Sequence, residues 1–363
     1  MLALRLARGS RPLVQLRRLL VAAACAGTGF LLLYVLAGAV VRPAGSFPRL
    51  LWALVPLAAT VHLAVAVART DPATRPRAGM DAVGLGPVRL TLVAAVSTAI
   101  SCTLGSVVAL AAFLHLRGDL GGLLFDGAGA RLLHADRPLP VAAALTLLVL
   151  VPLTASAATA FALRPHTPPA PRTGLPWGIA LTACGLAVEG YAGPGGAVLP
   201  AGWFLTALGL ALAGPGLAYA CGTLVQAARP GALRLLAGRA LQEEAPRIGR
   251  PLGVLCAVGA AALSAATLPG PGGPGSADGP GAPLGPLTAL ACALVALCAA
   301  ATLLTSAVEV RQSRSAARAA LLHLGTPGTV LRTAATVRAG ALLTVCVPVS
   351  WGVAQLTSLA LTR

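Results

Sequence analysis

Long apolar stretches, separated by short polar or Pro/Gly-rich segments, dominate the chain. A membrane-spanning helix needs about 20 consecutive, mostly apolar residues, and nine stretches reach or approach this length. They lie at about residues 19–41, 50–68, 90–116, 139–163, 176–194, 199–227, 252–268, 284–308 and 339–361. The stretch at 176–194 is the weakest, because it is rich in glycine and contains Glu189. The pattern predicts an all-α, polytopic transmembrane protein with about nine spans.

The composition supports a membrane protein. Of the 363 residues, 57% are hydrophobic and 10% charged, and the mean hydropathy is +0.84. About a quarter of the residues of a soluble domain are charged. The net charge of +17 comes from arginine, since the chain contains no lysine. These arginines are spread over many loops and do not alternate with aromatic residues on one face, so we expect no nucleic-acid partner.

The distribution of arginine predicts the orientation of the spans. Inner loops of membrane proteins carry an excess of basic residues. With the N-terminus inside, nine spans place most arginines in inner segments. These segments are residues 1–18, 69–89, 164–172, 229–250 and 309–338. Without the span at 176–194, all later loops change sides and more than half of the arginines face outside. We therefore expect nine spans, with the N-terminus inside and the C-terminus outside.

Two parts of the chain resemble each other. Residues 2–41 resemble 233–272, and Cys25 corresponds to Cys256. Residues 75–90 resemble 316–331 in the same order along the chain. Residues 75–90 and residues 316–331 each contain a basic segment, a glycine and a nearby proline, and each leads into an apolar stretch. Internal repeats are common in transporters, so the chain is predicted to contain two pseudo-repeated halves.

The repeat defines a domain organisation. Residues 1–163 form the first transmembrane half, with four spans. Residues 164–230 form a linker with two connecting spans, and residues 231–363 form the second half, with three spans. Each half contains one inner loop, which we name the first coupling loop (69–89) and the second coupling loop (309–338).

Each coupling loop is predicted to carry a short helix on the inner membrane face. In the second loop, small and leucine residues recur at helical spacing on one side and arginines on another. Gly84 and Gly325 suit the ends of such helices. A turn that only fixes the topology is one interpretation, and docking of a partner protein is the other. The residues expected to take part in docking are Arg75, Arg77, Val83, Gly84, Arg311, Arg314, Arg318, Leu321, Leu324 and Gly325.

The second coupling loop resembles a known family. Glu309-Val310-Arg311, then the leucine-rich run 321–326, then the stretch from about 339 follow one another in the order found in FtsX-like permeases of ABC transporters, the MacB-type transmembrane subunits. Residues 80–84 of the first loop give a weaker match. The chain resembles a duplicated member of this family that lacks the large external domain.

The resemblance implies a permease subunit in the plasma (inner) membrane of a bacterium. The chain would lie in the lipid bilayer, and its coupling loops would contact a separate ABC-type ATP-binding subunit. The sequence leaves open whether the chain acts alone or as a homo- or hetero-oligomer. A P-loop requires a lysine that reaches the nucleotide phosphates, and this chain has none. ATP is therefore expected on the partner, and we expect no catalytic residue, cofactor or metal in this chain.

Two ionisable residues inside apolar stretches are candidates for a functional role. Glu189 lies near the predicted outer end of its stretch, beside Tyr191, which favours a position at the membrane interface. His62 is expected to hydrogen-bond between helices. Use of either residue as a proton carrier would indicate a proton-coupled secondary transporter. A membrane scaffold or sensor that transmits an ATPase signal without transport is the other alternative.

Two further patterns concern the second half and the thiols. Residues 231–250 are amphipathic and predict an interfacial helix, with Leu236 and Leu241 on its apolar face; Glu243 and Glu244 are further candidates for contact with the ATPase. All eight cysteines lie in apolar stretches and none forms a C-x-x-C pair. Buried thiols are therefore expected, without a zinc site or a disulfide framework.

Overall fold

All regular secondary structure in the described part of the chain is α-helical. The computed structural model describes residues 12–41, 46–70, 87–120, 127–163, 174–192, 198–227, 231–267, 286–313, 323 and 328–362. In chain order its helices are α2 (Pro12–Val41), α3 (Ser46–Thr70), α4 (Pro87–Arg117), α5 (Val141–Ala162), α6 (Gly174–Ala192), α7 (Leu199–Ala227), α8 (Ala232–Thr267), α9 (Pro286–Ser313) and α11 (Gly328–Thr362). Each of the nine predicted apolar stretches lies on one of these helices.

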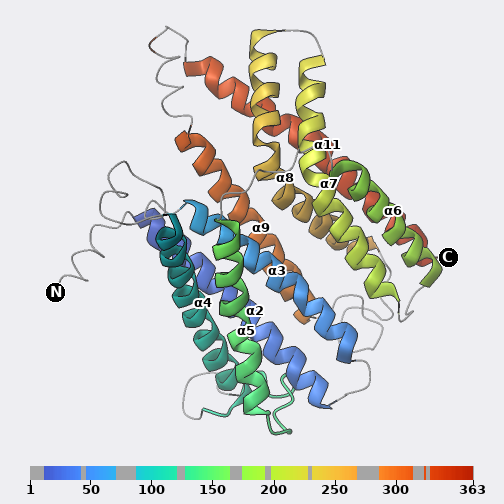
Figure 1. Ribbon diagram of the computed structural model, residues 1–363. Coiled ribbons are helices and arrows are strands. Elements are labelled where there is room, and N and C mark those ends of the chain that lie inside the picture. The colour runs from blue at the N-terminus through green and yellow to red at the C-terminus, as the bar shows by residue number, and fades with distance from the viewer. Residues whose placement is uncertain are drawn as a thin grey trace. The chain divides into compact units, whose positions relative to one another are not determined.

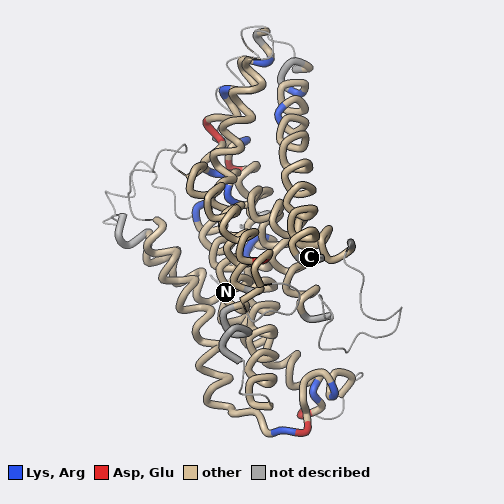
Figure 2. Tube along the Cα trace, turned by 90° about the vertical axis from the view of Figure 1, so that its right-hand side faces the viewer, with Lys and Arg blue, Asp and Glu red and all other residues tan. Residues whose placement is uncertain are grey.

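Eight of the described helices are long and apolar enough to cross a membrane, and α6 is the one left out. The weakest of the predicted spans is thus also the weakest in the structure. Figure 2 shows long stretches of helix without a charged residue. The fold is that of an all-α, multi-pass membrane protein, as the sequence predicts. The direction in which the helices cross the bilayer stays a prediction.

The helix α8 begins well before its predicted apolar stretch. The expected interfacial segment and the span form one continuous helix, although Pro246 and Pro251 lie within it. The buried face of its first part consists of Ala237, Leu241, Ala245 and Ile248. Leu236 is 44% exposed, so the predicted apolar face was partly wrong. Helical period selects the buried face: the buried residues recur every three or four positions, which keeps them on one side.

The chain divides into two compact units. The first comprises Met1–His166 with Leu290–Thr302, and the second comprises Thr167–Ala289 with Leu303–Arg363. The first boundary in the chain lies close to residue 163, the predicted end of the first half. Helices α6 and α7, which the sequence assigns to a connecting segment, belong to the second unit.

In the first unit, α2 packs against α3, α4 and α5 (Figure 1). Leu33 of α2 and Phe113 of α4 are fully buried, and the rings of Phe30 and Phe113 meet edge to face with their centroids 5.7 Å apart. In a soluble protein, burial of one large apolar side chain stabilises the fold by about 2 kcal/mol. In a bilayer, close packing replaces that driving force.

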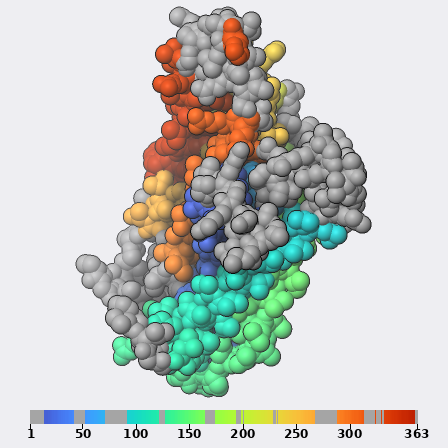
Figure 3. All heavy atoms as spheres, turned by 90° about the vertical axis from the view of Figure 1, so that its left-hand side faces the viewer, coloured from blue at the N-terminus to red at the C-terminus, as the bar shows by residue number. Residues whose placement is uncertain are grey.

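The outer side of the first unit is apolar. Helices α4 and α5 lie side by side on the face drawn in Figure 3. One stripe of α4 recurs every four residues and is more than half exposed along its whole length. It consists of Leu92, Val96, Ile100, Leu104 and Val108. An exposed aliphatic stripe of this length is the surface that a helix presents to lipid.

In the second unit, α7 lies between α6 and α8, and α11 crosses all three (Figure 1). Glycines make these contacts close. An added Cβ at Gly249 of α8 would collide with the backbone of Pro215 in α7, and one at Gly253 would collide with the carbonyl oxygen of Leu210. Small residues at these positions let the backbones of membrane helices approach one another.

Candidate functional site

The contact between α6 and α7 follows one regular row of facing residues. The row has heptad spacing in both helices, as in the seam of a coiled coil. The facing pairs are Gly178–Ala213, Thr182–Gly209, Gly185–Thr206 and Glu189–Gly202. Every pair contains a glycine, so the two helices approach closely along the whole row. Glu189 is the only charged residue in this row and faces the space that Gly202 leaves free.

Glu189 is completely enclosed in the second unit. Its side chain is 0% exposed, although Tyr191, two residues later, is 94% exposed. The hydroxyl of Thr206 on α7 donates a hydrogen bond of 2.8 Å to Oε1 of Glu189. The hydroxyl of Thr357 on α11 lies beside the same carboxyl group, while Oε2 has no hydrogen-bond partner. Three helices therefore shield this carboxyl group, and its predicted position near the membrane interface stays a prediction.

The enclosure of Glu189 has a signal in the sequence that the prediction missed. Residues 178, 182, 185 and 189 of α6 have the same spacing as residues 202, 206, 209 and 213 of α7. Two stretches of small residues with matching heptad spacing predict a close antiparallel pair of helices. The position of α11 over the end of this pair has no comparable signal, because it depends on packing between segments far apart in the chain.

Each unit contains a pair of neighbouring thiols, which lies between two of its own helices. In the first unit, the thiols of Cys25 on α2 and Cys102 on α4 lie next to each other. In the second unit, Cys256 on α8 and Cys346 on α11 form the same kind of contact. The sequence repeat already relates Cys25 to Cys256, but the correspondence of Cys102 with Cys346 was missed. All four cysteines are free thiols.

Comparison with protein-family models, with curated proteins and with solved structures finds no match for this chain. The described residues therefore establish a multi-pass, all-α membrane protein through their own features. Its candidate sites are the enclosed carboxyl group of Glu189, the repeated thiol pairs and the polar contacts of α8.

Charged residues of α8 make ion pairs with α11 and with the last part of α9, which belongs to the second unit. Arg338 on α11 donates a hydrogen bond of 2.7 Å to the carboxylate of Glu244, and both side chains are largely shielded. Arg247 lies 3.9 Å from Glu309 on α9, and the arginine is half exposed. We expected Glu244 to be available for a partner protein, but the structure pairs it with α11. This ion pair holds the first part of α8 against α11.

A polar contact joins three helices of the first unit. The hydroxyls of Thr28 on α2 and Thr60 on α3 lie 2.7 Å apart, and both residues are fully buried. Thr60 also donates a hydrogen bond to the carbonyl oxygen of Pro56, one turn earlier. The thiol of Cys298 on α9 lies 4.0 Å from the Thr60 hydroxyl. Buried hydroxyls of this kind stabilise contacts between membrane helices.

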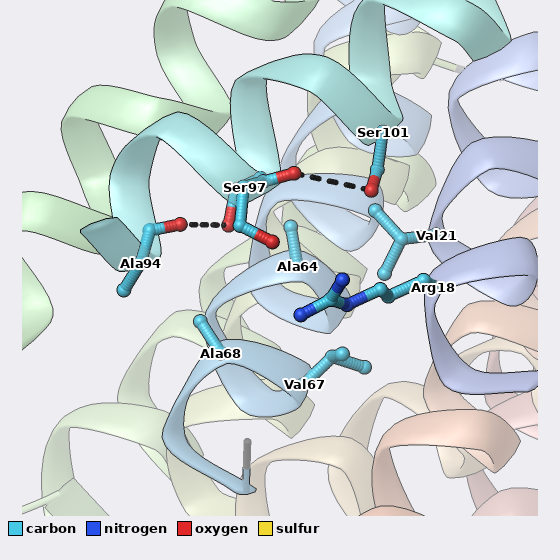
Figure 4. Close-up of a pocket in the computed structure, with 9 residues that line it drawn as sticks. Arg18, Val21, Ala64, Val67, Ala68, Ala94, Ser97 and Ser101 are labelled. Carbon is cyan, nitrogen blue, oxygen red and sulfur yellow. Dashed lines mark hydrogen bonds between the residues drawn. The ribbon is translucent and has the colours of Figure 1, made fainter. Parts of the chain in front are cut away.

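A small cavity lies between α2, α3 and α4 of the first unit (Figure 4). The side chain of Arg18 extends from α2 toward Ser97 and Ser101 of α4. The Ser101 hydroxyl donates to the carbonyl oxygen of Ser97 at 3.1 Å, so it is satisfied within α4. The cavity volume is about 20 Å³, which is enough for one water molecule.

Most of the predicted docking residues lie outside the described part of the chain. These are Arg75, Arg77, Val83, Gly84, Arg314, Arg318, Leu321, Leu324 and Gly325. Arg311 is described, and it is exposed in the last turn of α9. His62 is exposed on α3, and its expected hydrogen bond between helices stays a prediction. Among the described residues, no group of three or more potential metal-binding side chains occurs.

Proposed function

We propose that this chain is the transmembrane subunit of an ABC-type transport system, in which a separate ATP-binding subunit hydrolyses ATP. The coupling loops 69–89 and 309–338 are the surfaces that contact this partner. Support comes from the eight apolar helices, from the resemblance of the loops to FtsX-like permeases, and from the absence of any lysine that would allow the chain to bind ATP in a P-loop itself.

The observation that carries this proposal is the correspondence of two helix pairs. Helix α2 packs against α4, and α8 packs against α11, each time with a pair of thiols at the contact. The end of each coupling loop forms the start of the second helix of its pair, since α4 begins at Pro87 and α11 at Gly328. ATP-binding cassettes act as pairs of similar subunits, so a permease with two similar inner loops matches a partner with two similar docking surfaces.

The proposed mechanism is mechanical. ATP binding draws the two partner subunits together, and each subunit moves the loop that it contacts. The loops transmit this motion to α4 and α11, which are continuous helices of 31 and 35 residues. Because α4 and α11 pack against α2 and α8, the movement changes these contacts within each half. The transported substrate is moved, or exported, by this change.

Purification from native membranes in a mild detergent tests the proposal. The chain should co-purify with vanadate-sensitive ATPase activity, which must come from a partner. The double charge reversal Arg314→Glu with Arg318→Glu should abolish most of the co-purified activity. The control is the double change Arg131→Glu with Arg137→Glu, at two exposed positions in the segment between α4 and α5, which should leave the activity unchanged.

The outcomes separate the alternatives. An absence of ATPase activity from the native complex, or an equal loss in the control variant, contradicts the proposal. Activity that co-purifies without ATP-dependent substrate movement in reconstituted vesicles supports the scaffold or sensor alternative instead.

A second candidate function is a proton-coupled secondary transporter, and one observation favours it. The carboxyl group of Glu189 is fully buried with one oxygen unpartnered, as in membrane proteins that carry protons through ionisable side chains. The exposed position of His62 gives no such support. Proton-driven uptake into vesicles without an associated ATPase would favour this second function.

A further inference from the structure

We propose that Glu189, together with the hydroxyls of Thr206 and Thr357, is a proton-binding site whose occupied state holds α11 against α6 and α7. This goes beyond the proposed coupling to ATP, since it assigns a chemical role to a residue that the coupling loops do not involve.

The first step of the argument is the burial of the carboxyl group. An ionised carboxylate that is removed from water without a compensating charge costs many kcal/mol, and such a group takes up a proton instead. Glu189 is 0% exposed, and it receives one direct hydrogen bond of 2.8 Å from Thr206. Its second oxygen has no hydrogen-bond partner. Even with the Thr357 hydroxyl beside the same carboxyl group, two neutral hydroxyls do not replace the hydration of a full negative charge.

The second step concerns the charges on the helices packed against Glu189. Helix α6 contains no other charged residue, and α7 contains none. The arginines of α11 are Arg332 and Arg338. Thr357, the residue of α11 beside the carboxyl group, lies 19 positions after Arg338, which corresponds to about 28 Å along a helix. Among the described residues of these helices, no positive charge is therefore close enough to stabilise an ionised Glu189; Arg363, which follows α11, lies outside the described residues.

The other titratable side chains on these helices are not among the groups recorded beside the carboxyl group of Glu189. They are Cys184 and Tyr191 on α6, Tyr219 and Cys221 on α7, and Cys346 on α11. The side chains that contact the carboxyl group are the hydroxyls of Thr206 and Thr357. Both are neutral in the accessible pH range, so neither supplies a charge that could stabilise an ionised Glu189.

The third step distinguishes a proton from a metal ion. A bound cation requires several oxygen ligands and a space of its own. The row between α6 and α7 is filled: an added Cβ at Gly202 would lie 2.7 Å from Cγ of Glu189. One carboxyl group and two hydroxyls in such close packing suit a proton, which needs no additional volume.

The consequence is a link between protonation and helix packing. Thr357 and Ala360 bring the last part of α11 against Glu189 and Gly190, with Cβ of Ala360 3.8 Å from the position of an added Cβ at Gly190. When the proton leaves, the carboxylate requires water or a cation, and the enclosure must open to admit it. The end of α11 is the part of this enclosure that is not held by the glycine row.

Infrared spectroscopy of the full-length protein in lipid tests the site directly. At neutral pH, the exposed carboxyl groups are ionised, whereas a protonated Glu189 gives the C=O stretching band of a carboxylic acid. The band should be present in the native protein and absent in Glu189→Gln. Glu244→Gln is the matched control, because the carboxylate of Glu244 is paired with Arg338; this variant should keep the band. A missing band in the native protein, or a band that persists in Glu189→Gln, overturns the proposal.

Hydrogen exchange tests the link to α11. In the native protein, amides near Thr357 should lose protection as the pH rises, relative to the same amides in Glu189→Gln at each pH. The glutamine imitates the protonated acid in size and stays neutral, so this variant should remain folded and keep its protection. Identical protection of the two proteins across the pH range would contradict a link between the proton and α11. Neither measurement depends on an ATPase, so failure of this proposal and failure of the proposed function are distinguishable.

Discussion

Gly202 on α7 faces Glu189 on α6 so closely that an added Cβ would lie 2.7 Å from Cγ of the glutamate. This contact ends a row in which every residue larger than alanine faces a glycine on the other helix. The glycine thus provides the space for the one ionisable side chain in the row. Burial of Glu189 is a result of this register and not of its position along the apolar stretch.

The first prediction concerns this glycine. Gly202→Ala should destabilise the protein by about 1–3 kcal/mol, because an overpacked contact forces the helices or the glutamate to move. The measurement is thermal unfolding in detergent, followed by the loss of the monodisperse species. Gly340→Ala on α11 is the control, since an added Cβ there meets nothing within 4 Å. An equal loss of stability in the two variants would show that the close contact does not exist.

The second prediction concerns the hydroxyl pair of the first unit. Thr60→Val keeps the size of the side chain but removes the hydrogen bond with Thr28, which has an oxygen–oxygen distance of 2.7 Å. Hydrogen bonds between membrane helices contribute on average about 0.6 kcal/mol and at most about 1.7 kcal/mol, so the loss should fall in this range. Thr146→Val is the control, because the exposed Thr146 bonds only to its own helix in the described contacts. The idea fails if the control loses as much stability as Thr60→Val.

The third prediction compares two ion pairs. Arg338→Gln removes the shielded pair with Glu244 and should cost about 1–3 kcal/mol, because a charged hydrogen bond to a largely buried carboxylate is lost. Arg247→Gln removes the pair with Glu309, in which the charged atoms are 3.9 Å apart and the arginine is 55% exposed. That change should cost less than about 1 kcal/mol. Denaturation of both variants in the same detergent measures the difference, and a reversed order would refute the assigned packing of α8 on α11.

The fourth prediction concerns the repeated thiols. In a variant that keeps only Cys256 and Cys346, iodine should oxidise the two thiols to a disulfide, releasing two protons and reducing iodine to iodide. The same treatment should link Cys25 to Cys102 when only these two remain. Peptide mass spectrometry after proteolysis detects each cross-link. The pair Cys184 and Cys256 is the control, because their helices α6 and α8 do not pack against each other.

Cross-linking in one unit but not in the other would argue against a structural repeat. Cross-linking of the control pair to the same extent would indicate that the reaction reports collisions and not the packed contact. Both pairs are therefore needed, since the repeat is defined by their correspondence.

The sequence predicted the helices well and their contacts poorly. The stretch at 199–227 coincides with α7, whereas the predicted interfacial helix at 231–250 and the separate span from residue 252 are one helix, α8, which begins at Ala232. Hydropathy marks the part of a helix that lies in lipid, but a helix continues for as long as its backbone hydrogen bonds are favourable. The prediction that Leu236 lies on the buried apolar face was wrong for a related reason. The neighbouring helix selects which residues of an amphipathic segment are buried.

Local composition by itself determined that this is an all-α membrane protein, because a bilayer requires every backbone polar group to be satisfied within a helix and therefore imposes long apolar stretches. It also showed that the chain contains no lysine, and it indicated the repeat through Cys25 and Cys256. Only the tertiary structure decided that Glu189 is enclosed, that Glu244 is paired with Arg338, and that Cys102 and Cys346 complete two matching thiol pairs. These facts depend on contacts between residues far apart in the chain, and such contacts are set by the packing of whole helix faces, which no local pattern specifies.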